Sequence, residues 1–570
     1  MKTTRRPLNI LNYKESGNVN RRDFLQRSLK GGLALYCFGL GSQSSPALAQ
    51  TAPPPPDDLF YWSAARLARA IRDKLVSSEQ VVQAHLDRIV QVNGTINAAV
   101  QVTAKRALAE ARAADAALAQ GKNPGALHGV PMTIKDSFDT EGVITTAGTR
   151  GREKFVPAQD ATVVARLRAA GAVLLGKTNT PEFTFDGDTN NLVYGRTRNP
   201  FDLTRTPGGS SGGPATIVAV GGSPLDIGSD TVASIRWPAH CCGVAGIKPT
   251  SGRASLAGHI VGSGSPLGML TQPGPISRYV EDLILILPII AGPDPRDPIV
   301  QAKPLGNPAS LDLKLLRVSF HTNNGIEAPT AEIAEVVRAA ATALSGAVTD
   351  MVETYPSALS DTSAVTNGIF RLNGRQYFRD LLQAAGTSLS NAGPVLQYLS
   401  TSLTALTGAQ ITDAMARRDA FKQALLDFMQ DYDVILCPVN AQLAPLPEGD
   451  LSTSYTQAYN VAGFPAAVVR GGTSSQGLPI GVQIVGRPWK EHVVLAVAQF
   501  LETALGGWKP VPLPVLKVQR LSTSSNLSWK GYGTLQSSEQ IDGSWLELPK
   551  ASAPYRVINN GSNRFYRVRQ

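Results

Sequence analysis

Two serines, 24 residues apart, each lie in a short run of small residues, and a Lys-Asp pair precedes both of them. Ser210 lies in the glycine-rich run 208–213, and Ser234 ends the run 228–234. The charged pair is Lys135-Asp136. Small residues allow the backbone to turn tightly and to approach other segments closely. The chain must therefore adopt a fold that accommodates two tight, crowded turns.

The residue types in these runs are those of a serine nucleophile and its base. A serine hydroxyl reacts poorly at neutral pH unless a base takes its proton. Lysine can serve as that base only when it is uncharged, and burial favours the uncharged form by lowering the pKa. A second serine can relay the proton between nucleophile and lysine. Taken singly, a glycine-serine run is usually a loop and a Lys-Asp pair is usually a solvated surface feature.

The order and spacing of these motifs, together with their flanks, resemble the amidase signature family. The matching flanks are residues 175–183, 197–202, 242–253, 274–278, 460–466 and 477–488. The resemblance covers about residues 59–505 and is weakest between 295 and 431. That middle region usually shapes the substrate pocket of the family.

The resemblance implies roles for individual residues. Ser234 would be the nucleophile, Ser210 the bridging serine on a cis peptide bond, and Lys135 the base. The residues whose backbone N–H groups would form the oxyanion hole are Thr231, Val232, Ala233 and Ser234. The residues that would organise the surrounding loop are Ser211, Asp230 and Arg236. The implied reaction cleaves a carboxylic amide to an acid and ammonia or an amine through an acyl-enzyme, with no metal or organic cofactor.

The sequence departs from the family pattern just before the nucleophile. The family normally has two glycines where this chain has Val232 and Ala233. Valine cannot easily adopt a positive φ, so a loop that needs one at position 232 would be strained. A smaller departure is Pro214 after Gly213. These replacements motivate an alternative hypothesis, a catalytically impaired binding protein with an amidase fold.

Two other enzyme classes share parts of this pattern. Residues 208–212 satisfy the Gly-x-Ser-x-Gly elbow of hydrolases that use a Ser-His-Asp triad, but that elbow needs a buried strand before it. Residues 199–207 are instead polar and contain prolines, and the six histidines form no spaced cluster. His240 lies near the nucleophile in sequence, and we expect it to be structural. The second class is the transamidase subunit that makes glutaminyl-tRNA, which needs partner subunits in the cytoplasm.

The N-terminal residues predict export. Arg21-Arg22 begins a twin-arginine pattern, an apolar run follows at 31–40, and Ala47-Leu48-Ala49 is typical of a cleavage site after Ala49. The ten-residue apolar run is too short for a permanent membrane span. We therefore expect a signal peptide at 1–49, a proline-rich linker at 50–58 and a periplasmic or secreted protein without a membrane anchor. Export argues against the transamidase.

Charge and cysteine content restrict the partners. The first 49 residues hold +6 of the total charge of +10, which leaves +4 for the rest. Such a small excess does not imply a nucleic-acid partner. Outside the leader the cysteines are Cys241, Cys242 and Cys437, which make no disulfide framework. The expected partner is a small-molecule amide substrate, and the expected state is a monomer or homodimer.

Sequence periodicity predicts the fold class. Helical patterns cover residues 63–92, 98–120, 160–170 and 412–430, and short apolar runs at 172–175 and 434–436 are typical of strands. This alternation predicts an α/β/α sandwich around a large mixed β-sheet over residues 59–512. Residues 515–570 read as a small all-β module, with strands near 527–529, 533–536, 544–548 and 564–568. We expect the module to be a packing appendage, with Trp529, Tyr532, Trp545 and Tyr566 in its core. The alternative is that these aromatics are exposed and attach the protein to a surface or a carbohydrate.

Overall fold

The computed structural model describes most of the chain beyond the predicted leader. The described residues are 59–122, 125–447, 449, 451–512, 517–520, 524–528, 534–538, 546–548, 555–558 and 564–569. The predicted signal peptide 1–49 and linker 50–58 lie outside them, as do Trp529, Tyr532 and Trp545. No helix in the described ranges is long and apolar enough to cross a membrane.

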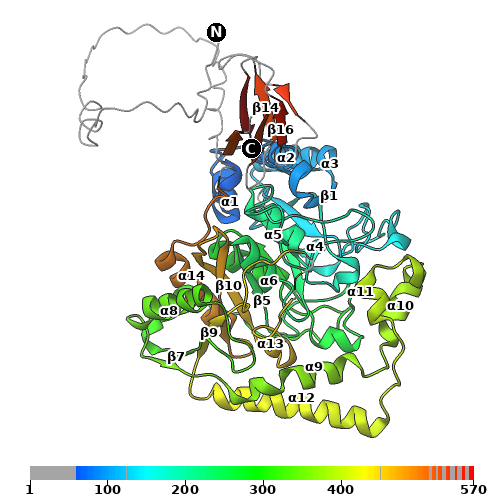
Figure 1. Cartoon of the computed structure of the whole chain (residues 1–570), viewed down its shortest axis with the longest axis vertical. Helices are drawn as coiled ribbons and strands as arrows, with labels where there is room; N and C mark the ends of the chain where they lie inside the picture. Colours follow the sequence, from blue (N-terminus) through cyan, green and yellow to red (C-terminus); the bar gives the residue numbers. More distant parts are fainter. Residues whose placement is uncertain are drawn as a thin grey trace. The chain divides into compact units, whose positions relative to one another are not determined.

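An 11-stranded mixed sheet forms the centre of the fold (Figure 1). In sequence order the strands are β1 (Ala99–Val102), β2 (Pro131–Lys135), β3 (Val173–Thr178), β4 (Leu225–Asp230), β5 (Ala245–Lys248), β6 (Gln272–Ser277), β7 (Arg317–Phe320), β8 (Asp350–Glu353), β9 (Val434–Pro438), β10 (Ala466–Thr473) and β11 (Pro479–Gly486). Their order across the sheet is β1-β3-β2-β4-β6-β5-β10-β11-β9-β7-β8. Strands β2, β3 and β4 are mutually parallel, as are β7, β8 and β9, whereas the remaining pairs are antiparallel.

Helices cover both faces of this sheet. They are α1 (Ala64–Arg72), α2 (Ser78–Ile96), α3 (Ala104–Ala119), α4 (Thr162–Ala169), α5 (Gly212–Ala219), α6 (Arg236–Cys242), α7 (Val280–Ile290), α8 (Ala331–Ser345), α9 (Thr362–Phe370), α10 (Gln376–Ala384), α11 (Pro394–Leu399), α12 (Gly408–Phe428), α13 (Gln457–Val461) and α14 (Glu491–Leu505). Successive residues of β3 enter different cores: Leu174 belongs to the core that includes residues of α7 and α14, whereas Val173 and Leu175 belong to the core that includes residues of α2 and α5. Because side chains alternate across a strand, the sheet separates two apolar layers. The predicted α/β/α sandwich is confirmed.

The helical patterns near the N-terminus are divided more finely than predicted. The pattern at 63–92 forms two helices, because Lys74 takes a positive φ of 57° after α1 and Ser77 then caps α2. The pattern at 98–120 begins with β1, which pairs with β3, and becomes helical only at Ala104. Asn97 ends α2 in the left-handed conformation, which asparagine tolerates better than most residues. The prediction of continuous helices was therefore wrong at these two points.

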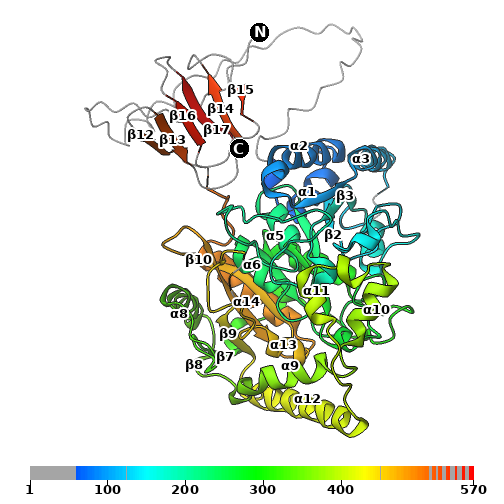
Figure 2. The same ribbon diagram turned by 45° about the vertical axis from the view of Figure 1, so that its right-hand side comes forward.

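The region of weakest resemblance contains helices α9 to α12. Helices α9 and α12 contact one another and run side by side in both views (Figures 1 and 2). They enclose a core that includes Val365, Phe421 and Leu425. The predicted helix 412–430 corresponds to α12, which begins earlier because Thr407 and Gln410 form a capping box.

The C-terminal segments form two small sheets, visible as red strands in Figure 2. One has the order β12-β13-β16 and the other β15-β14-β17. The strands are β12 (Lys517–Arg520), β13 (Ser524–Ser528), β14 (Thr534–Ser538), β15 (Leu546–Glu547), β16 (Tyr555–Ile558) and β17 (Phe565–Arg569). The all-β character of this part is as predicted, and β12 and β16 are strands that the sequence patterns did not indicate.

Parallel strands bring the motifs together. Lys135 is the last residue of β2, and Asp230 is the last residue of the parallel strand β4. Carboxyl ends of parallel strands meet at one edge of a sheet, where ligands commonly bind in α/β proteins. Helix α5 begins directly after Ser211, and α6 begins two residues after Ser234. The sheet therefore places Lys135 and both serine loops at the same edge.

A glycine on β6 permits close packing beside this edge. A Cβ atom at Gly274 would lie 2.0 Å from the backbone oxygen of Ile247. We expect Gly274→Ala to lower the free energy of unfolding by roughly 1–3 kcal/mol, because the backbone of β5 would have to move. Chemical denaturation measures the change. Gly346→Ala is the matched control, since no atom lies within 4 Å of its added Cβ; equal losses in the two variants would contradict this account.

Candidate active site

Lys135 is fully buried and surrounded by serine hydroxyls. Its Nζ lies 2.6 Å from Ser210 Oγ, 3.0 Å from Ser211 Oγ and 3.1 Å from Ser229 Oγ. The first two serines come from the loop before α5, and Ser229 comes from β4. The structure thus joins the predicted base to the predicted bridging serine.

Burial gives this lysine the property that a base requires. Removal from water lowers the pKa of Lys135 well below its usual value, although Asp230 and Asp226 act to raise it. Burial also raises the pKa of Asp226 to about 7, which weakens the charge on one of these two neighbours at neutral pH. Thr133 and Thr178 donate hydrogen bonds to Asp226, at 2.6 and 2.9 Å. The surroundings of Lys135 therefore favour an uncharged amine.

Two further lysines are fully buried, and neither contacts a serine. Lys177 donates to Phe138 O, Thr140 Oγ1 and Thr145 Oγ1, and it lies 3.9 Å from Asp136. Lys248 donates to the carbonyl of Pro249 at 2.9 Å. Among the buried lysines of the described chain, Lys135 is therefore the one whose position suits proton exchange with a serine.

The Ser210 loop is held by close backbone contacts. The Gly209–Ser210 peptide bond is cis, as the resemblance implies. A Cβ at Gly209 would lie 2.6 Å from the carbonyl oxygen of Asp186, so this loop packs directly on the segment that precedes it. Thr180 donates to the carbonyl of Ser210 at 3.1 Å, which further fixes the loop.

Ser234 lies next to the Ser210 loop and is 7% exposed. The backbone N–H of Ser211 donates to the carbonyl of Ser234 at 3.1 Å, so the two loops are in direct contact. Within the described residues, no hydrogen bond involves Ser234 Oγ or the backbone N–H groups of Val232, Ala233 and Ser234. These N–H groups are available to an oxygen of a bound molecule.

A buried ion pair holds the loop between β4 and α6. Arg236 Nε donates to Asp230 Oδ2 at 2.9 Å, and both side chains are fully buried. Asp230 also accepts from the backbone N–H of Ile235 at 3.1 Å. Burial alone would raise the pKa of Asp230, but the Arg236 charge and hydrogen bonds overcome it and hold the pKa at about 2. Asp230 is therefore ionised and anchors both ends of the loop.

Distant residues complete this anchor. Arg236 donates to Thr456 O and to Gln483 Oε1, each at 2.8 Å, and also to Asn460 Oδ1. Asn460 in turn donates to Asp230 Oδ1 at 2.9 Å. Residues more than 200 positions away in the sequence thus fix the loop that carries Ser234.

The replacements at positions 232 and 233 fit this loop without an unfavourable backbone. Neither Val232 nor Ala233 is among the residues of the described chain with a positive φ. Ala233 is buried, and Val232 packs against the same apolar core. The strain that the sequence suggested for a valine here is therefore absent. Pro214 lies within the first turn of α5, where proline is tolerated.

The triad alternative does not match the structure. Residues 199–209 form no strand before Ser210, whereas the elbow motif requires one. His240 is fully buried, accepts from the backbone N–H of Gly481 at 3.1 Å and stacks on Trp237, so its role is structural as expected. In the described ranges, no group of three or more His, Cys, Asp or Glu residues could hold a metal ion.

Two residues near Lys135 were given no role from sequence. Ser229 Oγ accepts a hydrogen bond from Lys135 Nζ, and His259 Nε2 lies 3.0 Å from the same oxygen. Ser229 could have been found, because it directly precedes Asp230 on the same strand. His259 gives no such signal, because it belongs to a loop after β5 and reaches the site only through tertiary packing.

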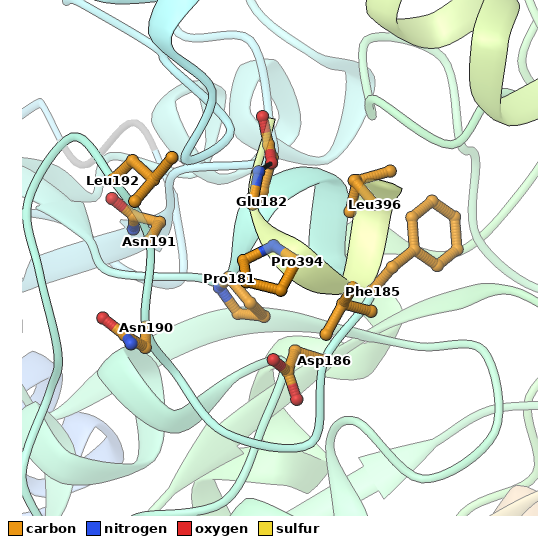
Figure 3. A pocket seen from close by; sticks show the side chains of 11 residues that line it. Pro181, Glu182, Phe185, Asp186, Asn190, Asn191, Leu192, Pro394 and Leu396 are labelled. Atoms are coloured by element: carbon orange, nitrogen blue, oxygen red, sulfur yellow. Dashed lines mark hydrogen bonds between the residues drawn. The ribbon is translucent and has the colours of Figure 1, made fainter. Parts of the chain in front are cut away.

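A cavity of about 190 Å³ lies between residues 181–192 and 393–396. Its walls come from residues 181–192 and from the start of α11 (Figure 3). Figure 3 shows Asn190, Asn191 and Leu192 across the cavity from Phe185 and Leu396. Segment 181–192 also contacts the Ser210 loop, because Thr189 Oγ1 donates to the carbonyl of Gly208 at 2.8 Å. One segment therefore borders both the cavity and the candidate active site.

The cavity contains two carboxylates, and neither has an ion-pair partner among the described residues. Glu182 accepts hydrogen bonds from Thr149 Oγ1 at 2.6 Å and from the backbone N–H of Gly393 at 2.7 Å. Asp186 accepts a hydrogen bond from the backbone N–H of Asp188 at 3.2 Å and likewise has no cationic side chain within 4 Å among the described residues. Burial raises the pKa of Asp186. Phe185, Pro394 and Leu396 form apolar parts of the wall, whereas Asn190 and Asn191 form polar parts.

Comparison with known proteins identifies the family. The family model described as Amidase matches residues 80–495. A glutamyl-tRNA(Gln) amidotransferase subunit of Moorella thermoacetica is 38% identical over 479 residues, which are 78% of this chain and 97% of the relative. The indoleacetamide hydrolase of Bradyrhizobium diazoefficiens is 33% identical, and the match covers 79% of this chain and 88% of that relative. The chain belongs to the amidase signature family.

A solved structure supports the same assignment. The structure of a 6-aminohexanoate cyclic dimer hydrolase complexed with substrate superposes with a TM-score of 0.71 at 28% sequence identity. The match covers 78% of this chain and 97% of that one. The family resemblance inferred from the motifs is confirmed, and the relatives include both amidotransferase subunits and amide hydrolases.

The Asp230–Arg236 pair generates a prediction about stability. We expect Arg236→Ala to lower the free energy of unfolding by about 3–5 kcal/mol, because it leaves Asp230 buried without its ion-pair partner. Denaturant unfolding of the purified variant measures this loss. Arg417→Ala removes an exposed pair with Asp413 on α12 and should change stability little. A small loss at Arg236 would show that the pair does not hold the loop.

Proposed function

We propose that the protein is a hydrolase that cleaves carboxylic amides to an acid and ammonia or an amine. The observation that carries the proposal is the buried, low-pKa Lys135 at 2.6 Å from Ser210, in a loop that is bonded to the Ser234 loop. A neutral amine in contact with a serine hydroxyl is the base that serine chemistry needs. Family membership supports the same reaction class.

In the first half-reaction, Ser234 Oγ attacks the amide carbonyl carbon. Its proton passes to Ser210 Oγ, while the proton of Ser210 passes to Lys135 Nζ. The carbonyl oxygen becomes an oxyanion and accepts hydrogen bonds from the N–H groups around Val232 to Ser234, which have no other acceptor in the described structure. The Ser210 and Ser234 hydroxyls are not hydrogen-bonded to one another in the free protein, and such catalytic bonds often form only with substrate present.

Collapse of the oxyanion breaks the C–N bond. The proton held by Lys135 returns through Ser210 to the leaving nitrogen, which departs as ammonia or an amine. An acyl-enzyme ester at Ser234 remains. Water then attacks this ester, gives its proton to Lys135 along the same route, and releases the acid as the proton returns to Ser234. Lys135, Ser210 and Ser234 finish in their starting protonation states.

The names of the relatives suggest a second candidate function for this chain, that of a transamidase subunit. The Moorella relative bears the name of an amidotransferase subunit. The twin-arginine pattern at Arg21-Arg22 favours a free-standing hydrolase, and we propose that the protein is exported to the periplasm or beyond. A binding protein without activity is less favoured, because Val232 and Ala233 cause no positive-φ strain in the loop.

The nucleophile assignment predicts the outcome of a direct test. We expect the protein to hydrolyse members of a panel of aliphatic, aryl, fatty-acyl and peptide amides without partner subunits. Ser234→Ala should reduce kcat by at least about 1000-fold, since the residual rate would come from binding and the oxyanion hole alone. Product release and fluorophosphonate labelling of Ser234 measure the effect.

Two further variants of the chain serve as controls for this test. Ser360→Ala changes an exposed serine far from Lys135 in sequence and should leave kcat unchanged. Restoring the family glycines with Val232→Gly/Ala233→Gly should change kcat little, because the present residues already fit the loop. Full activity in Ser234→Ala would refute the nucleophile, and activity that appears only with the glycines would favour the impaired-protein alternative.

The cavity between residues 181–192 and 393–396 predicts a charge preference. If substrate enters it, Asp186 should repel an anionic group, because no cation pairs with that carboxylate within the described chain. Asp186→Asn should then raise kcat/KM for an amide with a carboxylate substituent by roughly 5–10-fold relative to its neutral isostere. Asp413→Asn on exposed α12 is the control. An unchanged preference in Asp186→Asn would exclude the cavity as a substrate site.

A further inference from the structure

Ser229 is shared between the candidate base and a histidine. Its Oγ lies 3.1 Å from Lys135 Nζ and 3.0 Å from His259 Nε2. His259 is 6% exposed and packs against Phe138 with the ring centroids 4.6 Å apart. Its other ring nitrogen, Nδ1, lies 3.2 Å from both the carbonyl oxygen and the backbone nitrogen of Val261. A continuous chain of contacts therefore runs from Lys135 through Ser229 and His259 to the backbone.

Counting hydrogens determines which way the Ser229 hydroxyl must point when Lys135 is protonated. An ammonium has three N–H donors and no lone pair, and Lys135 has three serine hydroxyls as neighbours. Each serine then accepts a hydrogen bond from Lys135. Ser229 has one hydrogen of its own to place, and His259 Nε2 is its other partner among the described residues. Nε2 must therefore act as an acceptor in this state.

The same count applies when Lys135 is neutral. A neutral amine has a single lone pair, and the proposed relay requires Ser210 to donate to it. If Ser229 donated its hydrogen to Lys135 instead, the lone pair would be occupied and Ser210 could not deliver its proton. An acceptor at His259 Nε2 draws the Ser229 hydrogen away from Lys135. In both protonation states of the base, the productive arrangement needs the same orientation of Ser229.

His259 can supply that acceptor. Burial, together with the nearby Lys135, lowers the pKa of His259 to about 3, so the imidazole is neutral and carries one hydrogen. With that hydrogen on Nδ1, the ring donates to the carbonyl of Val261 and leaves Nε2 free to accept. In the opposite tautomer, Val261 N–H donates to Nδ1, and Nε2–H turns the Ser229 hydroxyl toward Lys135.

We propose that His259, acting through Ser229, is a positioning residue for the amide hydrolysis. By accepting a hydrogen bond from Ser229, it reserves the lone pair of neutral Lys135 for Ser210. It also satisfies the Ser229 hydroxyl while Lys135 holds the proton received from Ser210. The inference rests on the proposed function and adds to it a residue outside the serine and lysine motifs.

A double-mutant cycle with matched side chains tests this role. Gln and Met have similar size and shape, but only Gln presents a strong acceptor near the position of Nε2. We expect His259→Met to lower kcat by roughly 10–100-fold, the cost of leaving the buried Ser229 hydroxyl without its acceptor, with KM changed less than about twofold. His259→Gln should recover most of that loss. In a Ser229→Ala background, His259→Met should cause little further loss, because no hydroxyl remains to be oriented.

The outcomes separate this inference from the proposed function. An equal loss from His259→Met in both backgrounds, or an equal loss from Met and Gln, would overturn it and assign His259 to packing. A parent protein that neither hydrolyses amides nor labels at Ser234 would overturn both. An active parent with additive losses would overturn the His259 role alone.

A second measurement does not depend on the folding of the Met variant. In the ¹⁵N spectrum of protein labelled at histidine, the His259 signals are assigned by their loss in His259→Gln. We expect the shifts of a neutral ring with hydrogen on Nδ1 and an unprotonated Nε2. A ring protonated at Nε2 in the resting protein would overturn the inference.

Discussion

The candidate active site depends on keeping a lysine out of water without giving it a counter-ion. Lys135 lies at the end of a fully buried strand, and its close contacts are three hydroxyl groups instead of a carboxylate. Hydroxyls satisfy an amine in either protonation state, whereas an adjacent carboxylate would hold the proton on it. The parallel strands, the glycine-rich turns and the two helix starts all serve to bring those hydroxyls to one point.

Two buried acids, Asp230 and Asp226, lie near Lys135, and the protein reduces the effect of each on the charge of Lys135 in a different way. Asp230 stays ionised, but its charge is matched by Arg236 at 2.9 Å and by the amide of Asn460. Asp226 has no such cation in direct contact within the described chain, and burial raises its pKa toward neutrality while two threonines donate to it. The first acid shapes the loop that carries Ser234. The second contributes a weakened charge near Lys135.

Short sequence motifs predicted the candidate site residues better than they predicted helix breaks or contacts between distant residues. Lys135, Ser210 and Ser234 could be proposed because their short motifs match a family. The strand at 434–436 could be proposed because a short apolar run is typical of a strand. The break between α1 and α2 was missed because Lys74 adopts a left-handed conformation that its residue type does not suggest. Asn460 and Gln483 lie in flanks that match the family, and His259 lies in none of them. Their contacts with Arg236 and Ser229 arise only through long-range packing, so no local pattern gave these three residues a role. Whether Val232 is strained could be decided only from the backbone angles of the folded loop.

The cavity in Figure 3 has walls of two different origins. Segment 181–192 follows directly on the family motifs and contacts the Ser210 loop, whereas Gly393 to Leu396 come from the region that matches the family least. Replacement of α11 would therefore alter which molecules fit the cavity while leaving the contacts of Lys135 with its serines in place. If the cavity takes substrate, descendants of such a chain could diversify their substrates through this one wall and keep the proposed hydrolytic site unchanged.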